Sequence, residues 1–262
     1  MRRRTLIIGG SAATAALVAS AGYFGLPREA VGVSRRTYTW KGSDFLSGGT
    51  ASIPADLPEP VFRATPNCVT TCSFTLGPCH VDGIPVRKDI SAGIPGLPTR
   101  ISLRVVSMPD CSPIEGADVE LWHTDARGVY SGDAANMCNP DDQQAKQADF
   151  GRGRQISDAD GRVDFITVYP GWYPSRTVHI HLRVVVGGRE LLVSQLIFDD
   201  SLSDVIYADH SDYAGRGPRR VLNGNDRIIS EDEAADFIFD VEKLDAGVLQ
   251  ASFTIGVADD RC

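Results

Sequence analysis

Hydrophobic and polar residues alternate in short segments through much of the chain. Ile101, Leu103 and Val105 are separated by single polar residues, a period of two that is typical of a strand with one face in a core. The same period recurs at 119–123. Further apolar segments predict strands at 163–168, 177–186, 191–198, 237–244 and 248–257. Gly- and Asp-rich turns separate these segments, so we expect an all-β fold, an antiparallel β-sandwich.

Two stretches, 131–155 and 199–229, show no strand periodicity. In a β-sandwich, long loops gather at the ends of the strands and often carry function, and we expect both stretches to be such loops. A short helix is an alternative at 230–237, because Ser230 followed by Glu233 forms the pattern of a helix-capping box. That helix would compete with the start of the strand predicted next.

The N-terminal residues have the pattern of an export signal. Three arginines at positions 2–4 precede an uncharged run at 5–26, which is typical of a signal segment. Arg3 and Arg4, followed by Thr-Leu-Ile, fit the twin-arginine pattern, so we expect export to the medium or the cell surface. Small residues at 19–21 offer a cleavage site. The alternative is an uncleaved membrane anchor, since the uncharged run is close to the ~20 residues that a membrane helix needs.

The chain is expected to have three parts, an export signal at 1–21, a leader at 22–66 and one domain at 67–262. The leader mixes Pro, Gly, Ser and charged residues without clear periodicity, so we expect it either to wrap the domain or to stay mobile. No segment repeats itself, which argues against repeat architectures. The net charge of −8 argues against nucleic acid as a partner, because binding to phosphates needs a basic face.

The chain contains six cysteines. An even number behind an export signal predicts disulfides. Zinc is the alternative, but no two cysteines have the two-residue gap of a zinc knuckle. The expected pairs are Cys68–Cys111, Cys79–Cys138 and Cys72–Cys262. The first joins the segment before a Gly-Pro turn to the end of the first strand, the second reaches the loop after Tyr130, and the third is left by elimination.

Two histidines on one predicted strand are candidate metal ligands. Side chains alternate along a strand, so His179 and His181 share one face while Ile180 points to the other. Surface histidines are the alternative for such a pair. Two tyrosines, Tyr130 and Tyr173, lie just after turns, and phenolate oxygens are hard anionic ligands that suit Fe(III) better than zinc or copper. Taken separately, each tyrosine is more often a packing residue.

Three motifs, in this order, make the sequence resemble a known family. Gly-x-Tyr at 128–130, Pro-Gly-x-Tyr at 170–173 and His-x-His at 179–181 are similar to motifs of the intradiol ring-cleavage dioxygenases, in particular their exported actinobacterial members. The resemblance extends from 75 to 214 and implies an Fe(III) cofactor. The ligands that it implies are Tyr130, Tyr173, His179 and His181. Tyr169 lies before the Pro-Gly pair and does not match the motif.

The resemblance also implies catalytic roles. Arg176, three residues before His179, would stabilise negative charge on a bound catecholate, and Gln195 would hydrogen-bond the substrate. Tyr173 would leave the metal when the substrate binds and would accept one of its protons. The implied reaction cleaves a catechol-type ring between its two hydroxylated carbons, using O₂, to a cis,cis-muconate-type product. The alternatives are a surface cation for Arg176 and an ordinary strand residue for Gln195.

The sequence departs from the family in two places. Many members have Gly-Pro-Tyr where this chain has Gly-Pro-Cys at 77–79, and residues 27–66 do not resemble the helical dimerisation region of the catechol-cleaving branch. The ring substituents of the substrate and the oligomeric state therefore stay open. Two other functions remain alternatives. One is a transthyretin-like secreted binding module, which needs neither histidine, and the other is a copper or zinc protein that uses the histidines alone.

Overall fold

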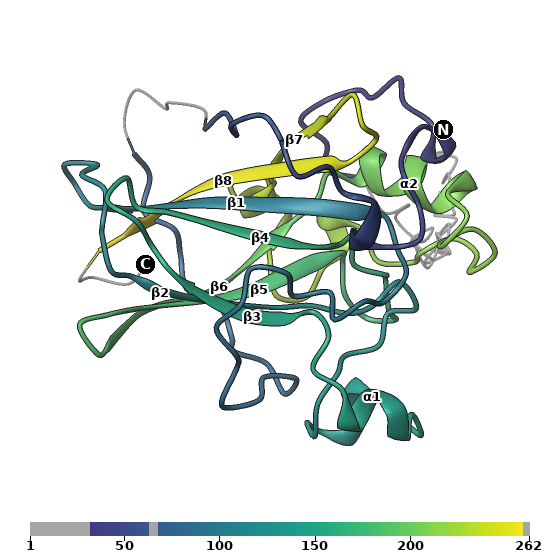
Figure 1. Cartoon of the computed structure of the whole chain (residues 1–262), viewed down its shortest axis with the longest axis horizontal. Coiled ribbons are helices and arrows are strands. Elements are labelled where there is room, and N and C mark those ends of the chain that lie inside the picture. Colours follow the sequence, from purple (N-terminus) through teal and green to yellow (C-terminus); the bar gives the residue numbers. More distant parts are fainter. Residues whose placement is uncertain (1–31, 63–67, 259–262) are drawn as a thin grey trace, which may run out of the picture.

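Two β-sheets lie one above the other (Figure 1), and apolar side chains at alternate strand positions fill the core between them. The computed structural model describes residues 32–62 and 68–258. Leu103 of one sheet and Leu121 and Leu182 of the other are fully buried, as the alternation in the sequence predicted. Each sheet therefore contributes one apolar face to a shared core, which is the arrangement of a β-sandwich.

Each sheet contains four strands among the described residues. In spatial order, the first consists of β4 (Arg162–Val168), β1 (Pro98–Ser107), β8 (Leu249–Val257) and β7 (Asp240–Lys243). The second consists of β3 (Arg152–Ile156), β2 (Asp118–Trp122), β5 (His179–Val186) and β6 (Arg189–Ile197). The predicted all-β sandwich is confirmed.

Antiparallel pairing, however, was the wrong expectation for one pair of strands. β1 and β8 run parallel, with Ile101 opposite Ala251. Alternation of apolar residues determines which face of a strand is buried but carries no information on the direction of its neighbour. The turn at 245–247, between the last two predicted strands, joins β7 to β8 as an antiparallel pair, and β8 also pairs with β1.

Regular elements also lie in the two stretches expected to be irregular loops. β3 is one of them, and its sequence Arg-Gly-Arg-Gln-Ile has too few apolar residues to show a period of two. The other is α2 (Asp200–Asp209), whose first turn is capped by Asp199 through a hydrogen bond from the backbone N–H of Ser201. Leu202 and Ile206, four residues apart, are fully buried on one face of α2. Packing of that face stabilises a helix too short to persist alone.

The remaining helices are short. α1 (Gln143–Gln147) lies in the loop before β3, and α3 (Glu231–Ala234) begins directly after Ser230. The Ser230 hydroxyl donates to the carboxylate of Glu233, so the predicted helical turn is confirmed, and β7 begins later than expected. The 3₁₀-helices are η1 (Gly42–Asp44), η2 (Thr50–Ser52), η3 (Asn136–Cys138), η4 (Asn223–Asn225) and η5 (Ala235–Phe237).

The described part of the leader, residues 32–62, wraps the domain, which is the first of the two expected arrangements. The backbone N–H groups of Arg35 and Arg36 donate to the carboxylate of Asp199, and Phe45 is buried in the core. In Figure 1 this purple segment passes over β7 and β8 and reaches α2. The expected export signal at 1–21 lies outside the described residues. None of the described helices is both long and apolar enough to cross a membrane.

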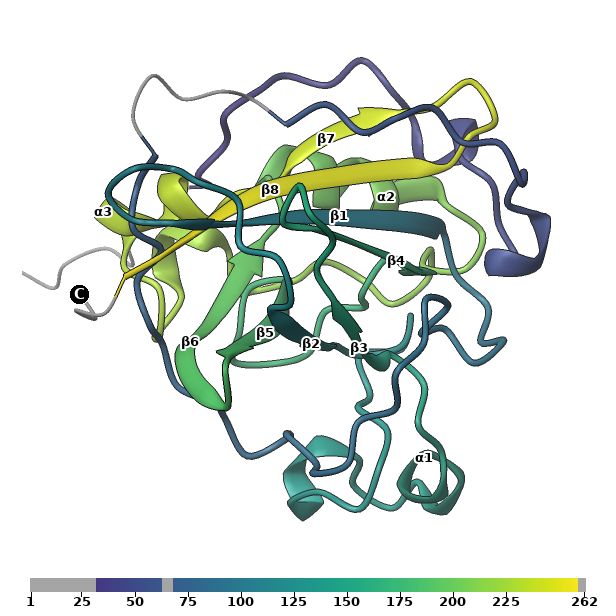
Figure 2. The same cartoon turned by 60° about the vertical axis from the view of Figure 1, so that its left-hand side comes forward.

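Two of the three expected disulfides are confirmed. The bonded pairs are Cys68–Cys111 and Cys79–Cys138, with S–S distances of 1.98 and 2.05 Å. The second pair joins the segment after the Gly-Pro turn to the loop that contains α1, and Figure 2 shows these two segments side by side below β3. The third expected pair, Cys72 with Cys262, involves a residue outside the described part of the chain.

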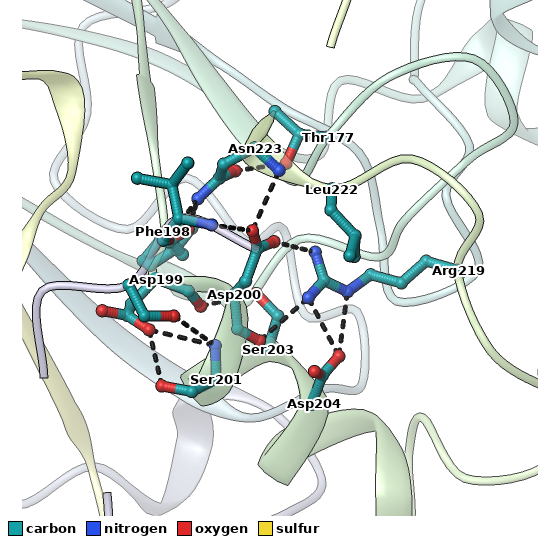
Figure 3. A network of polar contacts seen from close by, with 12 residues as sticks. Thr177, Phe198, Asp199, Asp200, Ser201, Ser203, Asp204, Arg219, Leu222 and Asn223 are labelled. Atoms are coloured by element: carbon teal, nitrogen blue, oxygen red, sulfur yellow. Dashed lines mark hydrogen bonds and ion pairs between the residues drawn. The ribbon is translucent and has the colours of Figure 1, made fainter. Parts of the chain in front are cut away.

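A buried polar network at the start of α2 holds the loop at 219–226 against the domain (Figure 3). Arg219 donates to Asp200 at 2.6 Å, with their side chains only 3% and 4% exposed. The second carboxylate oxygen of Asp200 accepts the backbone N–H of Asn223 at 3.0 Å. The side-chain oxygen of Asn223 accepts the hydroxyl of Thr177, which lies just before β5. The network therefore connects α2 to the start of β5.

We expect Arg219→Met to lower the free energy of unfolding by about 3–5 kcal/mol, because it leaves the Asp200 carboxylate buried without its cation. Burial already raises the pKa of Asp200, although Arg219 acts in the opposite direction. Urea denaturation provides the measurement. The control is Arg127→Met, which removes ion pairs from a side chain that is 63% exposed and should cost less than about 1 kcal/mol. Equal losses in the two variants would contradict this account.

Candidate metal centre

His179 and His181 lie on β5 with their rings on the same face of the strand. Their Nε2 atoms are 3.1 Å apart, and the residue between them, Ile180, points into the sandwich core. Both histidines are buried, with exposed fractions of 3% and 4%. The alternative of surface histidines is therefore wrong.

Two tyrosines bring their hydroxyl groups to the same point. The hydroxyl oxygen of Tyr130 lies 3.2 Å from His179 Nε2, and that of Tyr173 lies 3.4 Å from the same nitrogen. Tyr130 follows a turn in which the Asp125 carboxylate accepts the backbone N–H of Val129. The two hydroxyl oxygens and two imidazole nitrogens thus converge on one small volume, although their residues come from separate segments of the chain.

The hydrogen bond of His179 to Thr177 uses Nδ1 and leaves the lone pair of Nε2 available to bind a metal. Its Nδ1 lies 2.7 Å from the carbonyl oxygen of Thr177, and because a carbonyl only accepts, Nδ1 carries the proton and Nε2 carries a lone pair. Burial lowers the pKa of His179 to about 3, and burial also holds the pKa of His181 well below its usual value. Both rings are therefore neutral at pH 7, the state in which imidazole binds metals.

The phenols of Tyr130 and Tyr173 have the properties of ligands that need a cation. Burial raises the pKa of both groups, well above the usual value for Tyr130. A highly charged cation at the convergence point would favour the phenolates and release two protons. Two oxygen and two nitrogen donors fit Fe(III). A four-ligand shell at this point would consist of both tyrosines and both histidines. The described residues contain no group of three or more His, Cys, Asp and Glu side chains placed to hold a metal.

Trp122 and Gly77 form the surroundings of the second histidine. The ring of Trp122 stacks on His181, with centroids 4.8 Å apart and planes 10° from parallel. Gly77 has a φ of +76°, and a Cβ atom there would lie 3.2 Å from Cε1 of the same imidazole. A side chain at 77 would therefore be strained and crowd the site.

Arg176 and Gln195 lie next to this centre and contact each other. Gln195 lies opposite His181 in the pairing of β5 with β6. Its side-chain oxygen accepts a hydrogen bond from Nη2 of Arg176 at 2.5 Å. Arg176 is 9% exposed and Gln195 is fully buried, so the surface cation is the wrong reading of Arg176. The guanidinium also lies close enough to Tyr173 to lower the pKa of that phenol against the effect of burial.

Tyr169 lies elsewhere, as its mismatch with the motif predicted. Its hydroxyl is 2.7 Å from that of Ser203 on α2, and its ring belongs to the main core, whereas Tyr130 belongs to a separate small cluster with Trp122.

Sequence reasoning missed two side chains that shape the site, Asp226 and Trp122. Asp226 accepts a hydrogen bond from Nε of Arg176 at 2.9 Å, but it lies in a stretch of chain without periodicity, where its only local signal is a Gly-Asn-Asp turn. Trp122 is the residue before the His-Thr-Asp turn, and its position on β2, opposite His181, follows only from strand pairing.

Comparison with known proteins gives a consistent assignment. The family model described as "Dioxygenase" matches residues 77–241. A 6-chlorohydroxyquinol 1,2-dioxygenase of Cupriavidus pinatubonensis is 31% identical over 144 residues, which are 46% of this chain and 48% of that relative. Catechol 1,2-dioxygenase 1 of Acinetobacter lwoffii is 28% identical over 175 residues, 56% of this chain and 52% of the relative. The chain thus spans about half the length of these curated relatives.

A solved structure matches more completely. The intradiol ring-cleavage dioxygenase from Tetranychus urticae is 28% identical, with a TM-score of 0.66, and the match covers 74% of this chain and 98% of that one. The family match extends over more than half of the chain and includes all three motifs that frame the convergent tyrosines and histidines. The chain belongs to the intradiol ring-cleavage dioxygenases.

Proposed function

We propose that this protein is a non-haem Fe(III) dioxygenase that cleaves a catechol-type ring between its two hydroxylated carbons. The co-substrate is O₂ and the product is of the cis,cis-muconate type. The observation that carries the proposal is the convergence of Tyr130, Tyr173, His179 and His181, because the other three donor atoms lie 3.1 to 3.4 Å from His179 Nε2. When bound, ferric iron would supply a Lewis acid that polarises the diol and holds it in place.

The two tyrosines have different surroundings, which assigns them different roles. Tyr130 is 2% exposed, and its backbone is held by hydrogen bonds to Cys138 and from Asn139. Tyr173 is only partly buried and lies beside Arg176. Tyr130 would therefore be the permanent ligand of the iron. Tyr173 would be the ligand that the diol replaces, and its phenolate would accept a substrate proton as a general base.

Arg176 and Gln195 act on the substrate. A guanidinium beside Tyr173 stabilises negative charge on the diol oxygens as they lose their protons. Gln195 uses its oxygen to hold Arg176 and its Nε2 to donate to the carbonyl oxygen of Thr75 at 3.1 Å. These two bonds fix the Gln195 amide beside Arg176, and its remaining donor hydrogen would bind the substrate.

Oxygen incorporation tests the function directly. Catechol and hydroxyquinol are the first substrates to try, since they are the ring types named for the relatives. With ¹⁸O₂, the iron-loaded protein should give a ring-opened product that contains both labelled atoms. A transthyretin-like binding module would consume no O₂. The proposed reaction would be ruled out if every diol tested kept its ring intact or gave a product without ¹⁸O.

We also propose that the protein is exported by a twin-arginine route, with a membrane anchor as the outcome if the signal is not cleaved. Replacing Arg3 and Arg4 together by lysine should retain the protein in the cell, because this route depends on the arginine pair. The control is Arg2→Lys, outside the pair. Cell fractionation is the measurement. Normal export of the double variant would exclude the route and leave the fold unaffected.

A further inference from the structure

Arg176 is held from two sides. Its Nε donates to Asp226 at 2.9 Å and 3.3 Å to the two carboxylate oxygens, and its Nη2 donates to Gln195. A guanidinium is planar, so fixing Nε and Nη2 also fixes the direction of Nη1. Two partners thus determine the orientation of the whole group beside Tyr173.

Asp226 is itself immobile. Its side chain is fully buried, and its carboxylate accepts the backbone N–H groups of Thr177, Ile228 and Ile229 at 2.8, 2.9 and 3.1 Å. Burial raises the pKa of Asp226, but the hydrogen bond and charge of Arg176 outweigh this effect and lower it. The group is therefore an ionised carboxylate with fixed oxygens.

The loop that carries Asp226 is anchored at the start of α2. Asn223, three residues earlier, belongs to the network with Asp200 and Arg219 (Figure 3). The leader completes this anchor, because the N–H of Val33 donates to Asp200 at 2.9 Å and its carbonyl accepts the side chain of Asn223 at 3.2 Å. The position of Asp226 thus depends on contacts that reach from the leader to α2.

We propose that Asp226 is the positioning residue of Arg176, a fixed anion that turns the guanidinium toward the oxygens of the bound diol. Asp226 does not touch the substrate and acts only through Arg176. This inference rests on the proposed function, and it assigns a task to the irregular loop between α2 and α3.

The test is Asp226→Asn in the iron-loaded full-length protein. Asparagine keeps the size and one acceptor oxygen but removes the charge. We expect kcat/KM for the diol to fall about 10–100-fold, a loss usual for partners that orient a functional side chain. Spectral titration with 4-nitrocatechol without O₂ should show weaker binding, while iron content and the resting visible spectrum stay unchanged. Glu59→Gln, which neutralises the exposed partner of Arg162 on the other sheet, is the matched control and should behave like the wild type.

A double-mutant cycle separates positioning from a purely structural role. If Asp226 acts through Arg176, Asp226→Asn should cost little more once Arg176→Lys is present, so the two losses are not additive. If Asp226→Asn does not fold, Asp226→Glu takes its place, since it keeps the charge but moves the carboxylate.

The outcomes are distinct. The positioning role would be overturned by additive losses in the double-mutant cycle. It would also be overturned if the Asp226 variant kept its kcat/KM and its affinity for 4-nitrocatechol. In both cases, turnover by the wild type would leave the proposed function intact. Absence of ring cleavage by the wild-type holoenzyme would instead refute the proposed function itself.

Discussion

The His179→Ala variant is expected to lose iron and ring-cleaving activity together. His179 Nε2 is the atom that both tyrosine hydroxyls and the second imidazole approach, at 3.2, 3.4 and 3.1 Å. Its removal leaves three donors around an open position. Partners that only orient a metal ligand already contribute about 10–100-fold to metal affinity, so loss of the ligand itself should lower iron affinity at least about 100-fold. Iron analysis after ferric loading and gel filtration, with O₂ uptake in parallel, gives the answer.

His210→Ala is the control for this prediction. His210 is also buried, but its Nε2 donates to the carbonyl oxygen of Leu46 in the leader, and it lies outside the metal centre. This variant should keep its iron. The histidine assignment is wrong if His179→Ala retains stoichiometric iron and turnover, or if His210→Ala loses iron while His179→Ala does not.

Replacement of the two tyrosines by phenylalanine should give two different phenotypes. Tyr130→Phe removes the proposed permanent ligand, and we expect it to lose iron or to shift the visible band strongly. Tyr173→Phe removes the ligand that we propose the diol replaces, so it should keep more iron yet lose about 100-fold or more in kcat, the contribution typical of a general base. Visible spectra, iron content and kcat measured on the same preparations separate the two roles.

Tyr169→Phe is the internal control for the tyrosines. It loses a hydrogen bond to Ser203 in the main core, which should lower stability by about 1 kcal/mol and leave the visible band almost unchanged. If Tyr169→Phe bleaches the protein while Tyr173→Phe keeps its colour, the second motif was matched to the wrong tyrosine.

The sandwich could be predicted because its strands bury one face each. Leu103 and Leu182 occupy alternate positions that point into the core, and that alternation is visible in the sequence. The parallel pairing of β1 with β8 leaves no such trace. β3 could not be predicted either, because Arg152 and Arg154 occupy positions where a strand usually has apolar residues. Their guanidinium groups donate to carbonyl oxygens of a neighbouring segment, those of Cys79 and Ile84.

The candidate site was predictable where one strand or one motif carries it. His179 and His181 share a face because of the period of two, and Tyr130 and Tyr173 follow from the motif spacing. Asp226 was not predictable, since its contact with Arg176 depends on the position of a loop that the buried Arg219–Asp200 pair holds against α2. Contacts of this kind depend on tertiary packing, and the local sequence contains no periodic signal for them.

The visible spectrum of the purified, ferric-loaded protein tests the central claim most directly. If Tyr130 and Tyr173 bind Fe(III) as phenolates, charge transfer from tyrosinate to iron must colour the resting protein red-brown, at one iron per chain. Addition of a catechol without O₂ should shift that band as Tyr173 leaves and the diol binds. A protein that stays colourless after ferric loading, or that binds zinc or copper in place of iron, would contradict the account.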